Sequence, residues 1–144
     1  PGLTINDGRV LPDFAKNVIS NQDLMLLSDG SPTRTFCYIA DAITGYIKTL
    51  MSGRAGEAYN IGTSAPEISM ATFAEKVASV AQELFGYDRP IVYKKSEDSA
   101  YLVDNPSRRC PDISKARREI GYDPIISLEE GLARSILWYR DNSS

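Results

Sequence analysis

The sequence contains no histidine among its 144 residues. This absence excludes a Ser-His-Asp triad, a zinc site with histidine ligands and any general base that depends on an imidazole. The glycine-rich motifs G-x-G-x-x-G and G-x-x-x-x-G-K-[ST] are missing as well. The sequence therefore lacks the usual phosphate-binding loops of dinucleotide-binding and P-loop proteins.

Cysteine and long apolar runs are scarce. Cys37 and Cys110 lie far apart and form no C-x-x-C pair, which favours reduced thiols over a disulfide framework. No apolar run approaches the length of about 18 residues that a transmembrane helix needs. No charged start followed by an apolar stretch marks a signal peptide. We therefore predict a cytoplasmic protein without a membrane partner.

Charge is nearly balanced and slightly acidic. The formal net charge is −3, with 42% hydrophobic and 24% charged residues, a composition typical of a globular domain. Without a basic field, a nucleic-acid partner is not expected. A small anionic ligand bound by a few local arginines remains open. The length suits a single domain.

The periodicity of the apolar residues predicts an α/β fold. Helical spacing covers residues 10–21, and a short buried strand follows over residues 24–28. Residues 33–39 alternate like a strand, and a helix then runs from about Asp41 to Gly53. Further along, we expect a strand over residues 57–62, a helix between Ser69 and Gly86, a strand over residues 91–94, a helix over residues 114–120 and a last helix that opens at Ser127. The expected architecture is a small mixed sheet of three or four strands with about four helices.

Local capping signals support two of these helices. Ser69 is a suitable N-cap, and Ser127 to Glu130 has the spacing of a capping box. In the last helix, the expected buried stripe consists of Leu128, Leu132, Ile136 and either Tyr139 or Trp138.

Arg34 follows a turn of Asp29, Gly30, Ser31 and Pro32 and opens an apolar run. Strand alternation would place its side chain on the same face as two aromatic residues, Phe36 and Tyr38. A guanidinium matches two phosphate oxygens with its fork of N–H donors. An exposed arginine on an edge strand is the alternative, and from the local pattern alone it is the more ordinary one.

A second pair of arginines, Arg108 and Arg109, stands in a polar loop between Pro106 and Pro111. Prolines stiffen a loop and lower the cost of holding an arginine ready for an anion. Ordinary surface arginines are again the alternative. Two arginine sites in an acidic domain could together clamp a diphosphate.

Catalytic groups are not identified by any pattern. None of the eight tyrosines has a lysine four residues later, so the Y-x-x-x-K arrangement of a lysine-activated tyrosine is absent. Tyr38, Tyr59 and Tyr122 are better interpreted as half-buried core residues with hydrated hydroxyls. The carboxylates, including Asp7 and Asp104, show no paired arrangement for acid–base work. We assign no catalytic and no metal-binding residue.

Five segments in order resemble successive parts of one family. They are NDGRVLPDF, LMLLSDGSPTRTFCYIAD, EAYNIG, RRCPDISKAR and GYDPIISLEEGLARSILWYR. Over residues 1–141 the chain resembles the C-terminal, substrate-binding portion of the extended short-chain dehydrogenase/reductases, the NAD-dependent epimerase/dehydratase family. It looks most like UDP-glucuronate decarboxylases and dTDP-glucose 4,6-dehydratases.

The resemblance implies a parent enzyme about twice as long, with an N-terminal Rossmann half that binds NAD and carries the catalytic tyrosine and lysine. No cofactor-binding residue is therefore expected in residues 1–144. Arg34 corresponds to the family arginine that contacts the nucleotide diphosphate, and Arg109 or its neighbour Arg108 corresponds to a second one. Val10 lies in the segment that borders the nucleotide, and Leu27 lies along the base pocket.

The sequence thus predicts the substrate-binding domain of a nucleotide-sugar epimerase, dehydratase or decarboxylase, inactive by itself. Its first residue is Pro1, and we expect a fragment of a longer enzyme. Its partners would be a nucleotide sugar and the missing Rossmann half. An exposed apolar patch where that half docks predicts self-association. A free-standing nucleotide-sugar binding module and a non-catalytic structural or oligomerisation domain are the alternatives.

Overall fold

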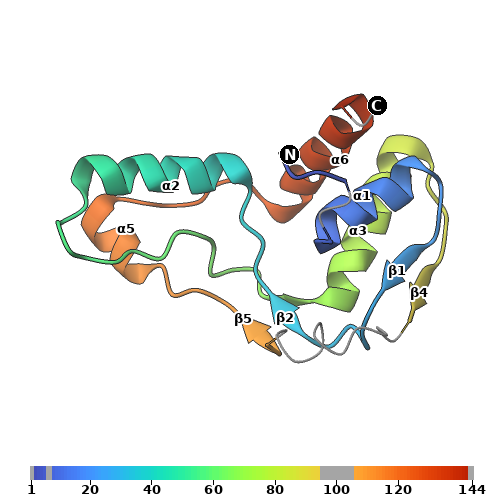
Figure 1. Cartoon of the computed structure of the whole chain (residues 1–144), viewed down its shortest axis with the longest axis horizontal. Helices are drawn as coiled ribbons and strands as arrows, with labels where there is room; N and C mark the ends of the chain where they lie inside the picture. The colour runs from blue at the N-terminus through green and yellow to red at the C-terminus, as the bar shows by residue number, and fades with distance from the viewer. Residues whose placement is uncertain (1, 6–7, 95–105, 143–144) are drawn as a thin grey trace.

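The structure is a computed structural model that describes residues 2–5, 8–94 and 106–142. Residues 95–105, which include Asp104, lie outside the described residues, as does Asp7. The described elements form two groups at opposite ends of the molecule, joined by a short sheet (Figure 1).

The larger group, the core half, consists of three helices and a strand pair. Its helices are α1 (Val10–Ile19), α3 (Met70–Phe85) and α6 (Leu128–Asn142), and its strands β1 (Leu24–Leu26) and β4 (Ile91–Tyr93) are parallel. The three helices pack on one another, and α1 and α3 also pack on β1 (Figure 1). The strands are the two predicted over residues 24–28 and 91–94, each slightly shorter than expected.

Aromatic stacking fills the centre of the core half. The Phe73 ring is fully buried and lies 3.9 Å from the Phe36 ring and 6.1 Å from the Phe14 ring, centroid to centroid. Tyr139 of α6 is 1% exposed, whereas Trp138 is 37% exposed. The open choice in the stripe of the last helix is thereby decided for Tyr139.

The predicted ends of α3 are confirmed, and at α6 one of the two contacts of the predicted capping box is found. The Ser69 hydroxyl accepts a hydrogen bond from the Thr72 amide, and Gly86 ends α3 in the left-handed conformation at φ 68°, which glycine adopts at little cost. At α6, the Ser127 hydroxyl accepts from the Glu130 amide at 3.2 Å. The Glu130 carboxylate accepts from Arg134 of the next turn.

The smaller group, the side lobe, consists of α2 (Ile39–Ser52), residues 53–62 and α5 (Ser114–Ile120). Its small core is formed by Ile113, Ala116, Ile120 and Tyr122, against which Tyr59 and Ile61 pack. Helix α5 has the predicted bounds and ends at Gly121, whose φ is 63°.

Helix α2 turns its polar face inward and its apolar face outward. Asp41 and Gly45 are buried. A Cβ at position 45 would lie 2.5 Å from Ile61 and 2.8 Å from Tyr122, so only glycine permits this close packing. The exposed large side chains on the opposite face are Ile39, Ile43, Tyr46, Ile47, Leu50 and Met51. We call these six residues the α2 apolar face.

The joining sheet consists of β2 (Thr33–Arg34) between β3 (Ile68–Ser69) and β5 (Arg108–Arg109). Strand β3 is antiparallel to β2, and β5 is parallel to it. The register places Arg34 beside Arg109 and Thr33 beside Arg108.

The α/β class is confirmed, with five helices and two small sheets in the part of the chain that is described. Two strand predictions need correction. The strand expected over residues 33–39 is present as β2 but ends at Arg34, and α2 begins at Ile39. Residues 57–62 form no strand. An extended segment becomes a strand only when a neighbouring segment forms backbone hydrogen bonds with it. None of the described helices is long and apolar enough to cross a membrane.

Candidate functional site

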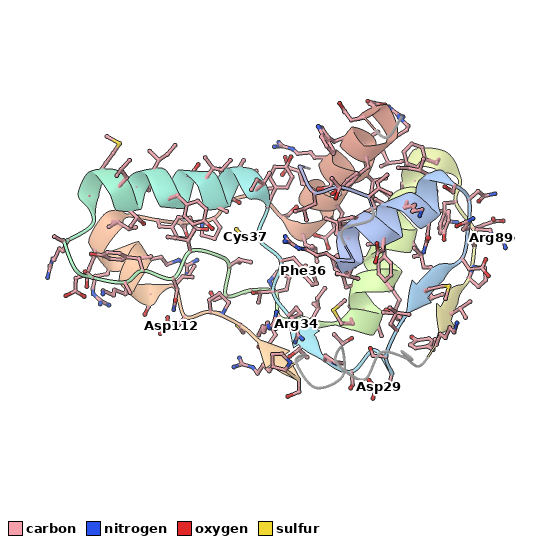
Figure 2. All side chains as sticks on the ribbon, viewed as in Figure 1. Asp29, Arg34, Phe36, Cys37, Arg89 and Asp112 are labelled. Carbon is pink, nitrogen blue, oxygen red and sulfur yellow. The ribbon has the colours of Figure 1, made fainter. Side chains whose placement is uncertain are left out.

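A cleft of about 550 Å³ opens between the core half and the joining sheet. Four of the five residues predicted to bind substrate line it: Val10, Leu27, Arg34 and Arg109. They come from α1, the end of β1, β2 and β5, which are far apart in the sequence. Figure 2 shows Arg34 and Phe36 between the two groups of elements.

Arg34 is half-buried at the floor of this cleft, and backbone carbonyls hold its guanidinium. Nη1 donates to the Thr33 carbonyl at 2.7 Å, and Nη2 donates to the Pro106 carbonyl at 2.6 Å. The bond to Pro106 links β2 to the segment that enters β5. Because the guanidinium is held before any ligand arrives, little side-chain entropy remains to be lost on binding.

Arg109 is the second arginine of the cleft. It lies beside Arg34 across the parallel strands β2 and β5, and paired residues of neighbouring strands project from the same face of a sheet. Alternation sends Arg108 to the other face, where its guanidinium forms two hydrogen bonds with the Glu67 carboxylate, both 2.8 Å long. The sequence left Arg108 and Arg109 open, and the structure brings only Arg109 together with Arg34.

The opposite wall of the cleft is apolar. It is formed by Val10 and Phe14 of α1 and by Met25, Leu26 and Leu27 at the end of β1. A flat ring could lie against this wall while its charged substituents reach the arginines. Val10 and Leu27 thus lie where a nucleotide base could contact them, and their role in binding stays a prediction.

Two charged residues of the cleft were missed at the sequence level, Arg9 and Asp13. With them, the charged lining consists of three cations, Arg9, Arg34 and Arg109, and one anion. The cleft is therefore locally cationic in a chain of net charge −3. The sequence predicts a helix that begins at Val10. This start places Arg9 at the N-cap and Asp13 in the first turn.

Cys37, which lines the cleft, contacts Tyr122 of the side-lobe core, with 3.6 Å between the thiol sulfur and the hydroxyl oxygen. Burial raises the pKa of the Cys37 thiol and also that of the Tyr122 phenol. The Tyr122 hydroxyl donates to the Gly62 carbonyl at 2.8 Å. This side chain is 1% exposed, so the expectation of a hydrated hydroxyl was wrong. Burial therefore favours the protonated form of both groups at neutral pH.

A second cavity of about 530 Å³ lies behind the cleft, and the segment Thr35 to Cys37 separates the two. Its walls are mostly apolar and include Leu11, Tyr38 and Leu128. It also reaches Ile39, the first residue of α2. This cavity is therefore continuous with the α2 apolar face. Across the described residues, no cluster of three or more His, Cys, Asp or Glu side chains could hold a metal ion.

Comparisons with known proteins identify similar sequences and similar folds. Residues 2–62 match the sequence profile of the NAD dependent epimerase/dehydratase family. The chain is 31% identical to UDP-glucuronic acid decarboxylase 1 of Arabidopsis thaliana, over 98% of its own length and 30% of that protein. An epimerase from Methanothermobacter thermautotrophicus matches it with a TM-score of 0.78 and 30% identity, over 94% of this chain and 38% of that one.

A third similar protein was solved with ligands. It is the UDP-glucuronic acid 4-epimerase of Bacillus cereus in complex with UDP-glucuronic acid and NAD, at 26% identity and a TM-score of 0.76. The match covers 93% of this chain and 40% of that one. In sequence and fold, the chain resembles the extended short-chain dehydrogenase/reductases. It spans about a third of the length of the relatives that it matches.

Proposed function

We propose that the cleft binds the nucleoside diphosphate of a UDP- or dTDP-sugar. Residues 1–144 would then be the substrate-binding domain of an NAD-dependent epimerase, dehydratase or decarboxylase that acts in the cytoplasm. The observation that carries the proposal is the pairing of Arg34 with Arg109 on the cleft side of the joining sheet. Names of relatives, which include UDP-glucuronic acid decarboxylases and a UDP-glucuronic acid 4-epimerase, support it.

The chemistry of the two walls matches the two ends of such a ligand. Each guanidinium can donate to diphosphate oxygens, and a charge-assisted hydrogen bond contributes about 1.5–3 kcal/mol. The apolar wall of Val10, Phe14 and Leu27 offers dry contact for the base. Held at both ends, the ligand would project its sugar in one direction, which is the orientation that a reaction on that sugar requires.

Hydride transfer itself would need the Rossmann half with its NAD, and this chain alone should be inactive. We propose that the α2 apolar face and the second cavity receive that half. Buried apolar surface contributes about 25 cal/mol per Å² to the free energy of a contact. A helix that exposes six large apolar side chains on one face therefore indicates a contact surface. In each relative, the aligned region is accompanied by more chain than it contains itself.

Calorimetric titration of the whole chain with UDP and dTDP tests the nucleotide site. We expect Arg34→Ala and Arg109→Ala each to weaken binding by roughly tenfold or more, which corresponds to one lost charge-assisted bond. Arg117→Ala removes an exposed arginine of α5 that pairs with Asp123 at 2.8 Å, and as the matched control it should change nothing. Unaltered affinity in Arg34→Ala, or no binding by the unmodified chain, would contradict the proposal.

A structural or oligomerisation role is the second candidate, and the exposed α2 apolar face favours it. That role predicts association of the chain without nucleotide binding. The titration separates the two candidates, because only the substrate-binding domain responds to UDP or dTDP.

A further inference from the structure

The face of the joining sheet that points away from the cleft has its own set of polar contacts. The Glu67 carboxylate accepts from the Thr33 hydroxyl at 2.6 Å. It also accepts from Nε and Nη2 of Arg108, both at 2.8 Å. Glu67 immediately precedes β3, so this one carboxylate connects all three strands of the sheet.

The register of β5 decides which arginine enters the cleft. Side chains alternate between the two faces of a strand, so a slip by one residue exchanges the faces. Such a slip would bring Arg108 beside Arg34 and turn Arg109 away. The strand is only two residues long, and backbone bonds beside it run from the Thr33 amide to the Ser107 carbonyl and from the Thr35 amide to the Arg109 carbonyl. A strand this short gains little register specificity from its own ladder.

We propose that Glu67 is a positioning residue that holds Arg108 on the outer face and thereby keeps Arg109 beside Arg34 in the cleft. Its negative charge is paired with the positive charge of Arg108, at 2.8 Å between Nη2 and the carboxylate. The expected effect of Glu67 on ligand binding rests on the proposed nucleotide site. The expected effect of Glu67 on the register of β5 is independent of that site.

Geometry distinguishes this ion pair from an ordinary surface pair. Exposed pairs contribute little when a single flexible contact forms them, and more when a planar fork engages both carboxylate oxygens. Glu67 is engaged through both oxygens and has a third donor, Thr33. Lys76 and Glu129, by contrast, join α3 to α6 through one carboxylate oxygen.

Hydrogen exchange of the Thr35 amide in the whole chain tests the register directly, because this amide donates to the Arg109 carbonyl at 3.3 Å. In Glu67→Gln, an isosteric change, we expect exchange of this amide to accelerate by roughly three- to tenfold. The Lys94 amide, which donates to Leu26 in the core half, should be unaffected. In the control variant Glu129→Gln, the Thr35 amide should exchange as in the unmodified chain.

Titration with UDP supplies the second measurement. If part of the population leaves the binding register, the apparent affinity falls by the same fraction, and we expect a weakening of roughly three- to tenfold in Glu67→Gln. The exchanged pair Glu67→Arg/Arg108→Glu restores the contact with reversed charges and should recover both amide protection and affinity. A merely destabilising role would lower the melting temperature without this recovery.

The outcomes separate the two proposals. Unchanged Thr35 exchange in Glu67→Gln overturns the positioning role, whether or not UDP binds. Faster exchange with unchanged UDP affinity also overturns it, because the register would then not matter for the ligand. Absence of UDP binding in the unmodified chain overturns the nucleotide site, while the exchange measurement still decides whether Glu67 sets the register.

Discussion

The core half contains three helices and the side lobe two, and the two parts bury very different numbers of apolar side chains. In the described residues, the core half buries thirteen side chains in one cluster, and the side lobe buries four. The side lobe nevertheless carries the most exposed apolar helix of the described chain, with Leu50 86% and Met51 79% exposed. Hydrophobic residues are thus present in both parts, but in the side lobe one whole helix face leaves them exposed.

This difference indicates that the apolar face of α2 is a contact surface rather than part of the core of this chain. Its inner face relies on close approach at Gly45 and on the buried Asp41, whose Oδ2 accepts from the Ile126 amide at 3.0 Å. Its outer face holds the side chains that would normally form a core. We therefore expect the core half to be stable by itself and the side lobe to depend on a partner.

Removal of Phe73 should have the largest effect on stability. Phe73→Ala deletes a fully buried ring between Phe14 and Phe36, and such truncations cost about 3–5 kcal/mol. Denaturant unfolding measures the loss. The matched variant Leu50→Ala in the α2 apolar face should leave the free energy of unfolding nearly unchanged, and an equal loss in both variants would remove the distinction between the two parts.

Tyr122→Phe probes the side lobe with a smaller expected loss. It removes the hydroxyl that donates to the Gly62 carbonyl and leaves that acceptor without this donor, at a cost of about 1–2 kcal/mol. Hydrogen exchange should accelerate in α2 and α5 and remain as it was in α3. Equal acceleration in all three helices would show that the two parts unfold as one unit.

Self-association of the chain should depend on the α2 apolar face. In Ile47→Ser/Leu50→Ser, we expect sedimentation at high concentration to yield monomers, because the exposed apolar area is reduced. Ile125→Ser changes a side chain that is 82% exposed outside α2 and serves as the control. Association that persists in the double variant would exclude this face as the contact.

The smallest effect concerns pH and the joining sheet. Hydrogen bonds from Arg108, followed by that from Thr33, hold the pKa of Glu67 below its ordinary value of 4.5. The stabilisation is therefore fully present above pH 4.5 and is lost as the pH falls through the lower pKa of the folded state. Compared with Glu67→Gln, the unmodified chain should lose its advantage in urea unfolding below pH 4.5. An advantage as large at pH 3 as at pH 7 would contradict this assignment.

Prediction from the sequence succeeded where the signals are local. The cap at Ser69, the left-handed glycines after α3 and α5 and the bounds of α5 depend on a few neighbouring residues. The strand expected over residues 57–62 failed because pairing depends on a distant neighbour. The outward orientation of the α2 apolar face could not be predicted either. Its apolar pattern indicates burial but does not indicate what covers it.

The candidate site divides in the same way. Arg34, Val10 and Leu27 were predicted from a resemblance, and the structure places all three around one cleft. Arg9 and Asp13 were missed because their positions at the start of α1 do not show which way its first turn faces.

The sequence by itself determined the helices and the caps at Ser69 and Ser127, because these follow from residues close together in the chain. Only the tertiary structure decided that Arg109 rather than Arg108 faces Arg34, that Glu67 joins the three strands and that the apolar face of α2 points outward. Each of these depends on the register or the packing of segments separated by tens of residues, and local propensity carries no information about such pairings.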